Sequence, residues 1–377
     1  MNILTDKGGV ACIFILILIM ANGSLIVSLT RVKYSLTISF LLENVGDSTI
    51  TYNIGCLGPK VYLIPTIEGW QELADIIVLV NGHREEYVIS TDGDGNTLVK
   101  LRNNMLIRRG ESVNITVIQE IWVYWSLMGL GFIRKRAVLP QSLSFSISEV
   151  PSNMSKYAYL NEKWSWWLKG ENKEFFEEKL HEILSRANTK DLAEVIRRIS
   201  LWVNTYVEDE QTSDNVKTPI ETLHKMKGTC MDQAFLISAA LRYYRIPAVI
   251  AYSIVYREGT YKINLSNYEE EYVNVYPHAF VMCWAPTVGW FPIDTAYNAQ
   301  DPIGGAAINV FDNVIILAKM VESNPVEFLS YPLPSDNVNL KVKIMLVKTS
   351  NPLITLALIC LALIALTFFL LKIARRH

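Results

Sequence analysis

Alternating polar and apolar residues dominate the chain between residues 31 and 123. Residues 34–42 alternate, residues 75–80 form an apolar run closed by the turn pair Asn81-Gly82, and further short runs follow at 97–101 and 112–118. Short segments of this kind separated by turns are typical of paired antiparallel strands. The pattern predicts a β-sandwich domain over residues 31–150.

The hydrophobic period changes to that of a helix after residue 172. Apolar residues recur at helical spacing over 192–206, and Thr218-Pro219-Ile220-Glu221 is a capping box with proline in the first turn. Another helix is expected from Cys230, and strands are expected at 248–256 and on both sides of 285–288. This order of elements predicts an α+β domain over residues 151–350.

Two apolar segments enclose these domains. Residues 353–371 carry no charge and are followed by Lys372, Arg375 and Arg376. At about 1.5 Å per residue this segment nearly spans a bilayer, and the basic tail favours a cytoplasmic C-terminus. Residues 1–30 are expected to be either a transmembrane anchor or a signal peptide, and 351–377 a transmembrane helix with a basic tail. Both alternatives predict a protein of the cell membrane with its main domains outside the cytoplasm.

Composition narrows the possible partners. The net charge of the 377 residues is −2, which gives no indication of a nucleic-acid partner. The five cysteines are scattered, with no zinc spacing and no disulfide framework, so neither a metal nor a cofactor is expected. The loop at residues 92–96 is acidic but lacks the glycine and glutamate of a calcium loop, and a turn is the preferred interpretation. No feature of the sequence defines an oligomeric state.

The helix expected from Cys230 places a thiol in its first turn, a position that favours the thiolate form. Thr229 is suited to the N-cap, and Asp232 completes a capping-box-like pair. Residues 234–241 are apolar almost all round, which predicts a central, covered helix. A thiol in the first turn lies at the positive end of the helix dipole, which favours the nucleophilic thiolate.

A predicted hairpin supplies two further polar groups. If its turn is centred on Pro286, His278 lies directly opposite Asp294, and directly opposed residues have Cβ atoms about 5 Å apart. The other face of the hairpin then carries a core set that includes Cys283. Pro292 within the second strand indicates an edge strand or a bulge.

These motifs resemble those of the transglutaminase-like superfamily, in particular its archaeal and bacterial membrane-anchored members. The resemblance covers roughly residues 155–330 and rests on four motifs in the family's order: Gly228-x-Cys230, Ile246-Pro247-Ala248, His278-Ala279-Phe280 and Gly289-Trp290-x-Pro292-x-Asp294-Thr295. The family more often has tryptophan where Phe280 stands. Residues 94–96 and 109–113 resemble an immunoglobulin-like module found before some of these domains. The resemblance therefore implies a papain-like α+β core preceded by an immunoglobulin-like β-sandwich, with terminal transmembrane segments.

The resemblance also implies a reaction. Cys230 would be the nucleophile, His278 the base and later the acid, and Asp294 the group that orients the imidazole. An oxyanion needs hydrogen-bond donors, and the backbone N–H of Cys230 is one candidate. His224 is a weaker second candidate, for which a place on the helix surface is the preferred interpretation. The expected activity is thiol acyl transfer on amides of a peptide or protein substrate, with hydrolysis slightly favoured over transfer to an amine. The alternative is a catalytically idle domain that serves as a surface interaction module.

Overall fold

A computed structural model describes residues 31–124, 139–144, 150–185, 187–188, 191–211, 215–295, 302–303, 313–328, 330–350 and 361. The expected anchors at 1–30 and 351–377 therefore lie outside the described residues, apart from position 361. No helix within the described ranges is long and apolar enough to cross a membrane.

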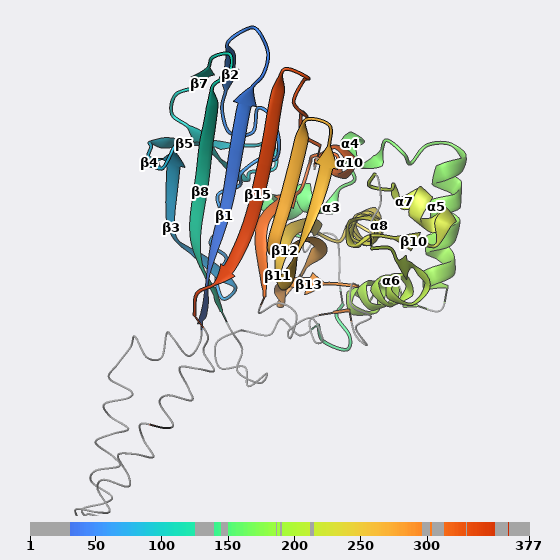
Figure 1. The fold of residues 1–377 in the computed structure, drawn as a ribbon. Helices are drawn as coiled ribbons and strands as arrows, with labels where there is room; N and C mark the ends of the chain where they lie inside the picture. The colour runs from blue at the N-terminus through green and yellow to red at the C-terminus, as the bar shows by residue number, and fades with distance from the viewer. Residues whose placement is uncertain are drawn as a thin grey trace, which may run out of the picture.

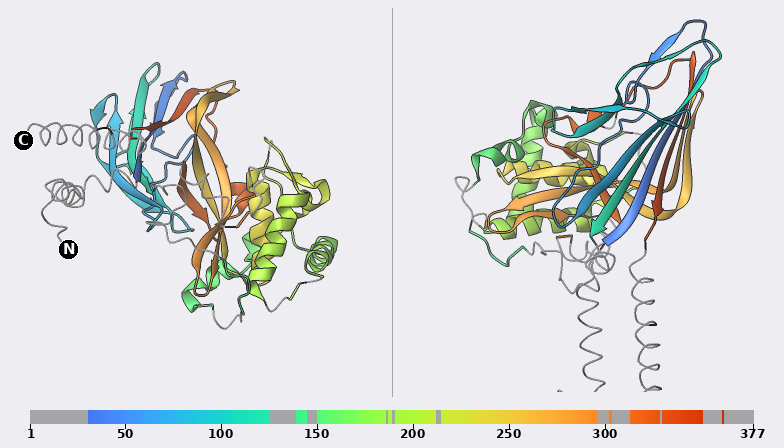
Figure 2. Two further views of the ribbon diagram at one scale, coloured as in Figure 1. Left: turned by 90° about the horizontal axis from the view of Figure 1, so that it is seen from below. Right: turned by 90° about the vertical axis from the view of Figure 1, so that its left-hand side faces the viewer.

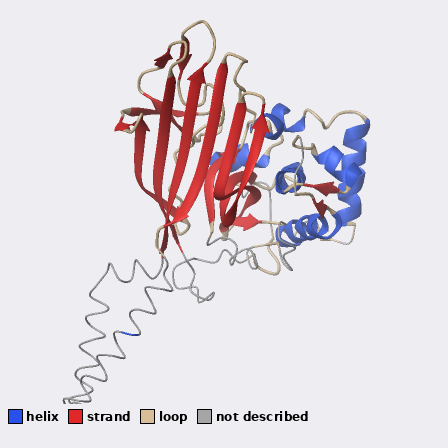
Figure 3. Cartoon of the chain, viewed as in Figure 1, coloured by secondary structure: helices blue, strands red, loops and turns tan. Residues whose placement is uncertain are grey.

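Nine strands form one large sheet, whose long strands lie side by side in Figures 1 and 3. Its order is β14-β11-β12-β15-β1-β8-β3-β4, and β13 pairs with β12 outside this path. The bounds are β1 (Arg31–Asn44), β3 (Gln71–Val80), β4 (His83–Arg84), β8 (Ser112–Tyr124), β11 (Ala248–Leu265), β12 (Tyr268–Ala285), β13 (Gly289–Ile293), β14 (Val314–Met320) and β15 (Val338–Lys348).

The last strand joins the two halves of this sheet. β15 pairs antiparallel with β1, with Tyr34 opposite Lys348, and parallel with β12, with Tyr268 opposite Leu340. The N-terminal strands therefore continue the sheet of the C-terminal half. The architecture is a mixed α+β fold built on one large sheet, while the expected domain boundaries remain predictions.

Short strands cover one face of the N-terminal half. They are β2 (Ile50–Tyr52) with β7 (Met105–Ile107), and β5 (Tyr87–Thr91) with β6 (Thr97–Leu101). Every second residue of β1 is buried, as its alternation predicts, and these side chains share a core with β8 and with residues of the short strands. The same core includes residues of β12 and β15, so it crosses the join between the two halves.

The helices gather beside β11, β12 and β13, at one end of the molecule (Figures 1 and 2). Their bounds are η3 (Ser152–Met154), α3 (Ser155–Ala158), α4 (Glu162–Ser165), α5 (Glu171–Leu184), α6 (Leu192–Tyr206), α7 (Pro219–Lys225), α8 (Cys230–Tyr243) and α10 (Pro325–Phe328), with the two-residue strands β9 (Glu208–Asp209) and β10 (Lys227–Gly228) between α6 and α8.

Helix α8 is the central helix of this group, as its apolar sequence predicts. Residues 231–242 are all buried, and its apolar side chains share a core with α5, α6, α7 and the inner face of the β12–β13 hairpin. Apolar burial on every side fixes the position of the helix, and with it the position of its first residue, Cys230.

The acidic loop at residues 92–96 connects the two halves. Oδ1 of Asp94 accepts hydrogen bonds from the backbone N–H groups of Glu322 and Ser323, at 2.6 and 2.9 Å. The side chain of Asn96 accepts from the backbone N–H of Lys319 and donates to its carbonyl oxygen. Within the described ranges no cluster of metal-ligating side chains is present. The hydrogen bonds of Asp94 and Asn96 dock this loop onto the end of β14 and the residues that follow it.

Candidate active site

Cys230 is the first residue of α8, as predicted. The hydroxyl of Thr229 accepts from the backbone N–H of Asp232 at 3.4 Å, and the Asp232 carboxylate accepts from the backbone N–H of Thr229 at 2.8 Å. This reciprocal capping box fixes the first turn of the helix. Cys230 is partly exposed, so its thiol is accessible while it lies at the positive end of the helix dipole.

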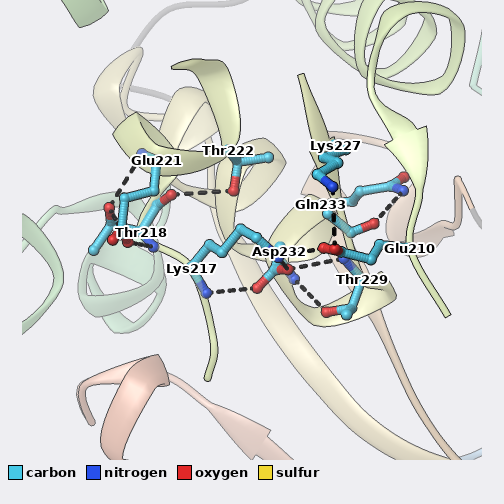
Figure 4. Close-up of polar contacts among 10 residues, drawn as sticks. Glu210, Lys217, Thr218, Glu221, Thr222, Lys227, Thr229, Asp232 and Gln233 are labelled. Carbon is cyan, nitrogen blue, oxygen red and sulfur yellow. Dashed lines mark hydrogen bonds and ion pairs between the residues drawn. The ribbon is translucent and has the colours of Figure 1, made fainter. Parts of the chain in front are cut away.

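A buried ion pair reinforces this first turn (Figure 4). Nζ of Lys217 lies 3.2 Å from Oδ2 of Asp232, and the backbone N–H of Lys217 donates to Oδ1 of the same carboxylate at 2.7 Å. The Lys217 ammonium also pairs with Glu210. Its pKa is raised, because these carboxylates outweigh the lowering effect of burial. Sequence reasoning found the cap at Asp232 but missed Lys217, because residues fifteen positions apart have no local signal.

Gly228 allows close packing of the chain just before Cys230, the candidate nucleophile. A Cβ at this position would lie 2.7 Å from Cβ of Asp232, much closer than a normal contact. The carbonyl oxygen of Gly228 accepts from Nε2 of Gln233 at 3.2 Å. The glycine of the Gly228-x-Cys230 motif therefore lets the chain pass close to the capping carboxylate.

The predicted register of the hairpin is wrong by two residues. Trp284 pairs with Trp290 and Ala285 with Gly289, which moves Asp294 from a position opposite His278 to one beside Phe280. The loop is centred on Thr287 and not on Pro286, and Thr287 and Gly289 have φ angles of 63° and 81°. These left-handed conformations favour a longer loop that closes at the glycine. A shift by two residues leaves every side chain on its predicted face.

Asp294 and His278 remain neighbours, because residues on a diagonal across two strands are within reach of longer side chains. Nε2 of His278 donates to Oδ2 of Asp294 at 2.9 Å, and the two side chains are only 5% and 4% exposed. The imidazole also stacks near Phe280, with ring centroids 6.0 Å apart. Burial and a short bond to a carboxylate hold the ring in one orientation.

The same imidazole ring interacts with Cys230. Burial alone would lower the pKa of His278, but the charge and hydrogen bond of Asp294 and a hydrogen bond to the Cys230 sulfur outweigh it and raise the pKa to about 10. Since Nε2 is engaged by the carboxylate, Nδ1 is the nitrogen left for the sulfur. The structure thus brings Cys230, His278 and Asp294 together, and the interactions of the imidazole favour its charged form.

The other face of the hairpin is core, as predicted. Ala279, Val281, Cys283, Phe291 and Ile293 are buried in the cluster that contains α8. Burial raises the pKa of the Cys283 thiol. The strand that contains Pro292 pairs with β12 alone among the described strands, in keeping with an edge. His224 stacks on Phe175, with ring centroids 4.3 Å apart, which favours a packing role on the helix surface.

A cysteine at the start of a buried helix and a histidine–carboxylate pair on an adjoining hairpin, carried by a mixed α+β fold, are characteristic of papain-like and transglutaminase-like proteins. Residues 179–295 match the family model of the transglutaminase-like superfamily. This part of the chain is therefore a transglutaminase-like domain, as the sequence motifs indicate.

One solved structure shares the fold of this chain. A putative cysteine protease from Cytophaga hutchinsonii aligns with a TM-score of 0.52 at 11% identity, over 85% of this chain and 92% of that one. At this identity the likeness concerns the fold alone. LapG of Legionella pneumophila (TM-score 0.28, 12% identity, 48% of this chain and 86% of that one) and the periplasmic domain of TgpA from Pseudomonas aeruginosa (0.29, 14%, 69% and 88%) match too weakly to extend the argument. No curated protein matches the chain.

Proposed function

We propose that this protein is a thiol acyl-transfer enzyme that acts on amide bonds of peptides or proteins through Cys230, His278 and Asp294. The observation that carries the proposal is the buried His278, which is held by Asp294 at 2.9 Å and hydrogen-bonded to the sulfur of Cys230. A nucleophile, a base and an orienting group arranged in this way are the parts that amide acyl transfer needs.

The first half-reaction follows from these contacts. The Cys230 thiolate attacks the amide carbonyl carbon, and the carbonyl oxygen takes up the negative charge next to the backbone N–H groups at the start of α8. The C–N bond then breaks, and the proton held by His278 passes to the leaving amine, which leaves a thioester on Cys230. Asp294 keeps the ring oriented and stabilises its charged form throughout.

The second half-reaction returns the enzyme to its starting state. Water or an amine attacks the thioester carbonyl, gives a proton to His278, and releases the thiolate with a free acid or a new amide. We favour water as the acceptor, because no feature of the sequence excludes it from the acyl-enzyme. Incubation with a glutamine-containing protein and a labelled primary amine tests this choice: new chain termini indicate hydrolysis, and incorporation of the label indicates transfer.

We further propose that the apolar segments at both ends of the chain anchor the protein in the cell membrane, and that the transglutaminase-like domain and the expected immunoglobulin-like region lie outside the cytoplasm. The uncharged stretch at 353–371 and the basic residues after it support this arrangement. Its substrate would then be a peptide or protein of the extracytoplasmic space.

Alkylation of Cys230 tests the proposed activity without a known substrate. The full-length chain in mild detergent is treated with iodoacetamide at pH 6, and the adducts are quantified by mass spectrometry. Cys56 is a free, exposed cysteine of the same chain and serves as the internal reference. A thiolate that persists below the ordinary thiol pKa of about 8.5 should make Cys230 react faster than Cys56.

The variant His278→Ala distinguishes the proposed enzyme from the alternative, a catalytically idle interaction module. It should slow alkylation of Cys230 at pH 6 and leave Cys56 unchanged. Equal rates at the two cysteines, with no effect of His278→Ala, would favour the idle module.

A further inference from the structure

Strand β9 and the residue after it carry three consecutive acidic side chains close to the site, those of Glu208, Asp209 and Glu210. Their surroundings differ. Strand β9 pairs parallel with β10, which places Asp209 next to Gly228, two residues before Cys230. The backbone N–H of Glu210 donates to the carbonyl oxygen of Gly228 at 3.0 Å, so this segment is fixed against the chain that leads into α8.

The negative charge of Glu210 is balanced by two lysine side chains. Its carboxylate pairs with Lys217 and, at 3.6 Å, with Nζ of Lys227 (Figure 4). Its pKa is lowered, with the hydrogen bond from Lys217 as the largest cause. Glu210 therefore belongs to the support of the first turn of α8 and offers little free charge to a ligand.

Asp209 faces a different set of groups. Partial burial raises the pKa of its carboxyl, His278 opposes this rise and Asp294 adds to it, so the side chain lies within electrostatic reach of both. Its hydrogen bond is with Nε2 of Gln211, at 3.4 Å. In the described part of the chain no lysine or arginine pairs with it. An exposed carboxylate without a basic partner thus lies beside Gly228, two residues before Cys230, where the charges of His278 and Asp294 affect it.

We infer that Asp209 is a specificity-determining residue, which selects substrates that carry a cationic group, a lysine or arginine side chain, beside the amide that reacts. The inference rests on the proposed acyl-transfer function and adds a substrate class to it. The carboxylate of Glu210 pairs with Lys217 and Lys227, whereas that of Asp209 has no lysine or arginine partner in the described part of the chain. A cation bound near Asp209 gains attraction from its carboxylate, which has no basic partner, whereas an anion is repelled.

Charged thiol reagents test the inference directly. The full-length chain in detergent, at pH 7 and low salt, is treated with two methanethiosulfonates of similar size, one with a trimethylammonium group and the other with a sulfonate group. The measured quantity is the ratio of their rate constants at Cys230, divided by the same ratio at Cys56. The test variant is Asp209→Asn, Asp209→Glu is the conservative rescue, and Glu208→Gln removes the adjacent exposed carboxylate as the matched control.

We expect the normalised ratio to exceed one in the wild type and to fall about fivefold in Asp209→Asn, with most of it retained in Asp209→Glu and Glu208→Gln. About 1 M salt should weaken the preference in the wild type, because the groups are close to the surface. A ratio unaffected by Asp209→Asn, or lowered equally by Glu208→Gln, overturns the inference and leaves the proposed function standing. A Cys230 that the neutral iodoacetamide also modifies no faster than Cys56 overturns both.

Discussion

Lys217 and Asp232 form a buried ion pair, with Nζ 3.2 Å from Oδ2, at the point where the helix carrying Cys230 begins. Asp232→Asn keeps the shape of the side chain but leaves Lys217 with one carboxylate fewer in a buried position. We expect the free energy of unfolding to fall by about 2–3 kcal/mol, as measured by denaturant titration. Alkylation of Cys230 should slow as well, because the first turn of α8 loses its support. Lys262→Gln, which breaks an exposed pair with Glu269, is the control and should change little.

Asp294 should matter more for reactivity than for folding. Asp294→Ala removes the carboxylate that stabilises the charged form of His278. Alkylation of Cys230 at pH 6 should therefore fall roughly tenfold or more, and turnover on an identified substrate should fall further. Parallel unfolding curves test the folding part of this prediction. A variant that unfolds far more easily but reacts normally would assign Asp294 a structural role.

Cys283 should behave in the opposite way. It is fully buried in the core, and burial raises the pKa of its thiol. Cys283→Ala should cost roughly 1 kcal/mol of stability and leave Cys230 alkylation unchanged. In the wild type, iodoacetamide should reach Cys283 only after unfolding. Rapid modification of Cys283 in the folded protein would contradict its position on the core face.

Stability should depend on pH through His278. Its pKa is about 10 in the folded protein, whereas an unperturbed histidine has a pKa of about 6.5. Between these values the folded state binds more protons than the unfolded state, so this contribution is fully present below pH 6.5 and is lost as the pH rises towards 10. Unfolding free energies measured from pH 6 to 10 should decline, and the decline should be shallower in His278→Gln.

The topology predicted from the two apolar ends can be checked in intact cells. Ser335 is exposed in the folded chain, so an engineered cysteine there is accessible. In a background that lacks both Cys56 and Cys230 (Cys56→Ser with Cys230→Ser), Ser335→Cys should react with a membrane-impermeant maleimide added to intact cells. Labelling that occurs only after lysis would place this region inside the cytoplasm.

The hairpin shows how far the sequence determines the site. Alternation alone assigned His278 and Asp294 to one face and Cys283 to the other, because side chains in a strand repeat every two residues. The register depends on the backbone conformation of Thr287. This residue adopts a left-handed conformation, which is uncommon for a residue other than glycine and cannot be predicted from the sequence. The error was two residues, and the side chains of His278 and Asp294 are long enough to meet on the diagonal.

Groups distant in sequence were harder to find. Local pattern identified Cys230 and its cap, since a capping box lies within four residues. Lys217 and Asp209 reach the site through tertiary packing and a two-residue parallel pairing, and neither leaves a periodic signal. For the same reason the pattern predicted the N-terminal strands but did not show that they continue the sheet of the transglutaminase-like domain.

The position of β15 has a consequence for the order of folding. This strand lies between β1 and β12, yet it is the last described strand to leave the ribosome. The ladder between residues 34 and 348 therefore closes only after all the residues between them have been made. Until then β1 and β12 each expose an unpaired edge, which can pair with other chains. Closure over such a long separation is slow, so the unfinished chain is exposed to aggregation through these edges until β15 is added.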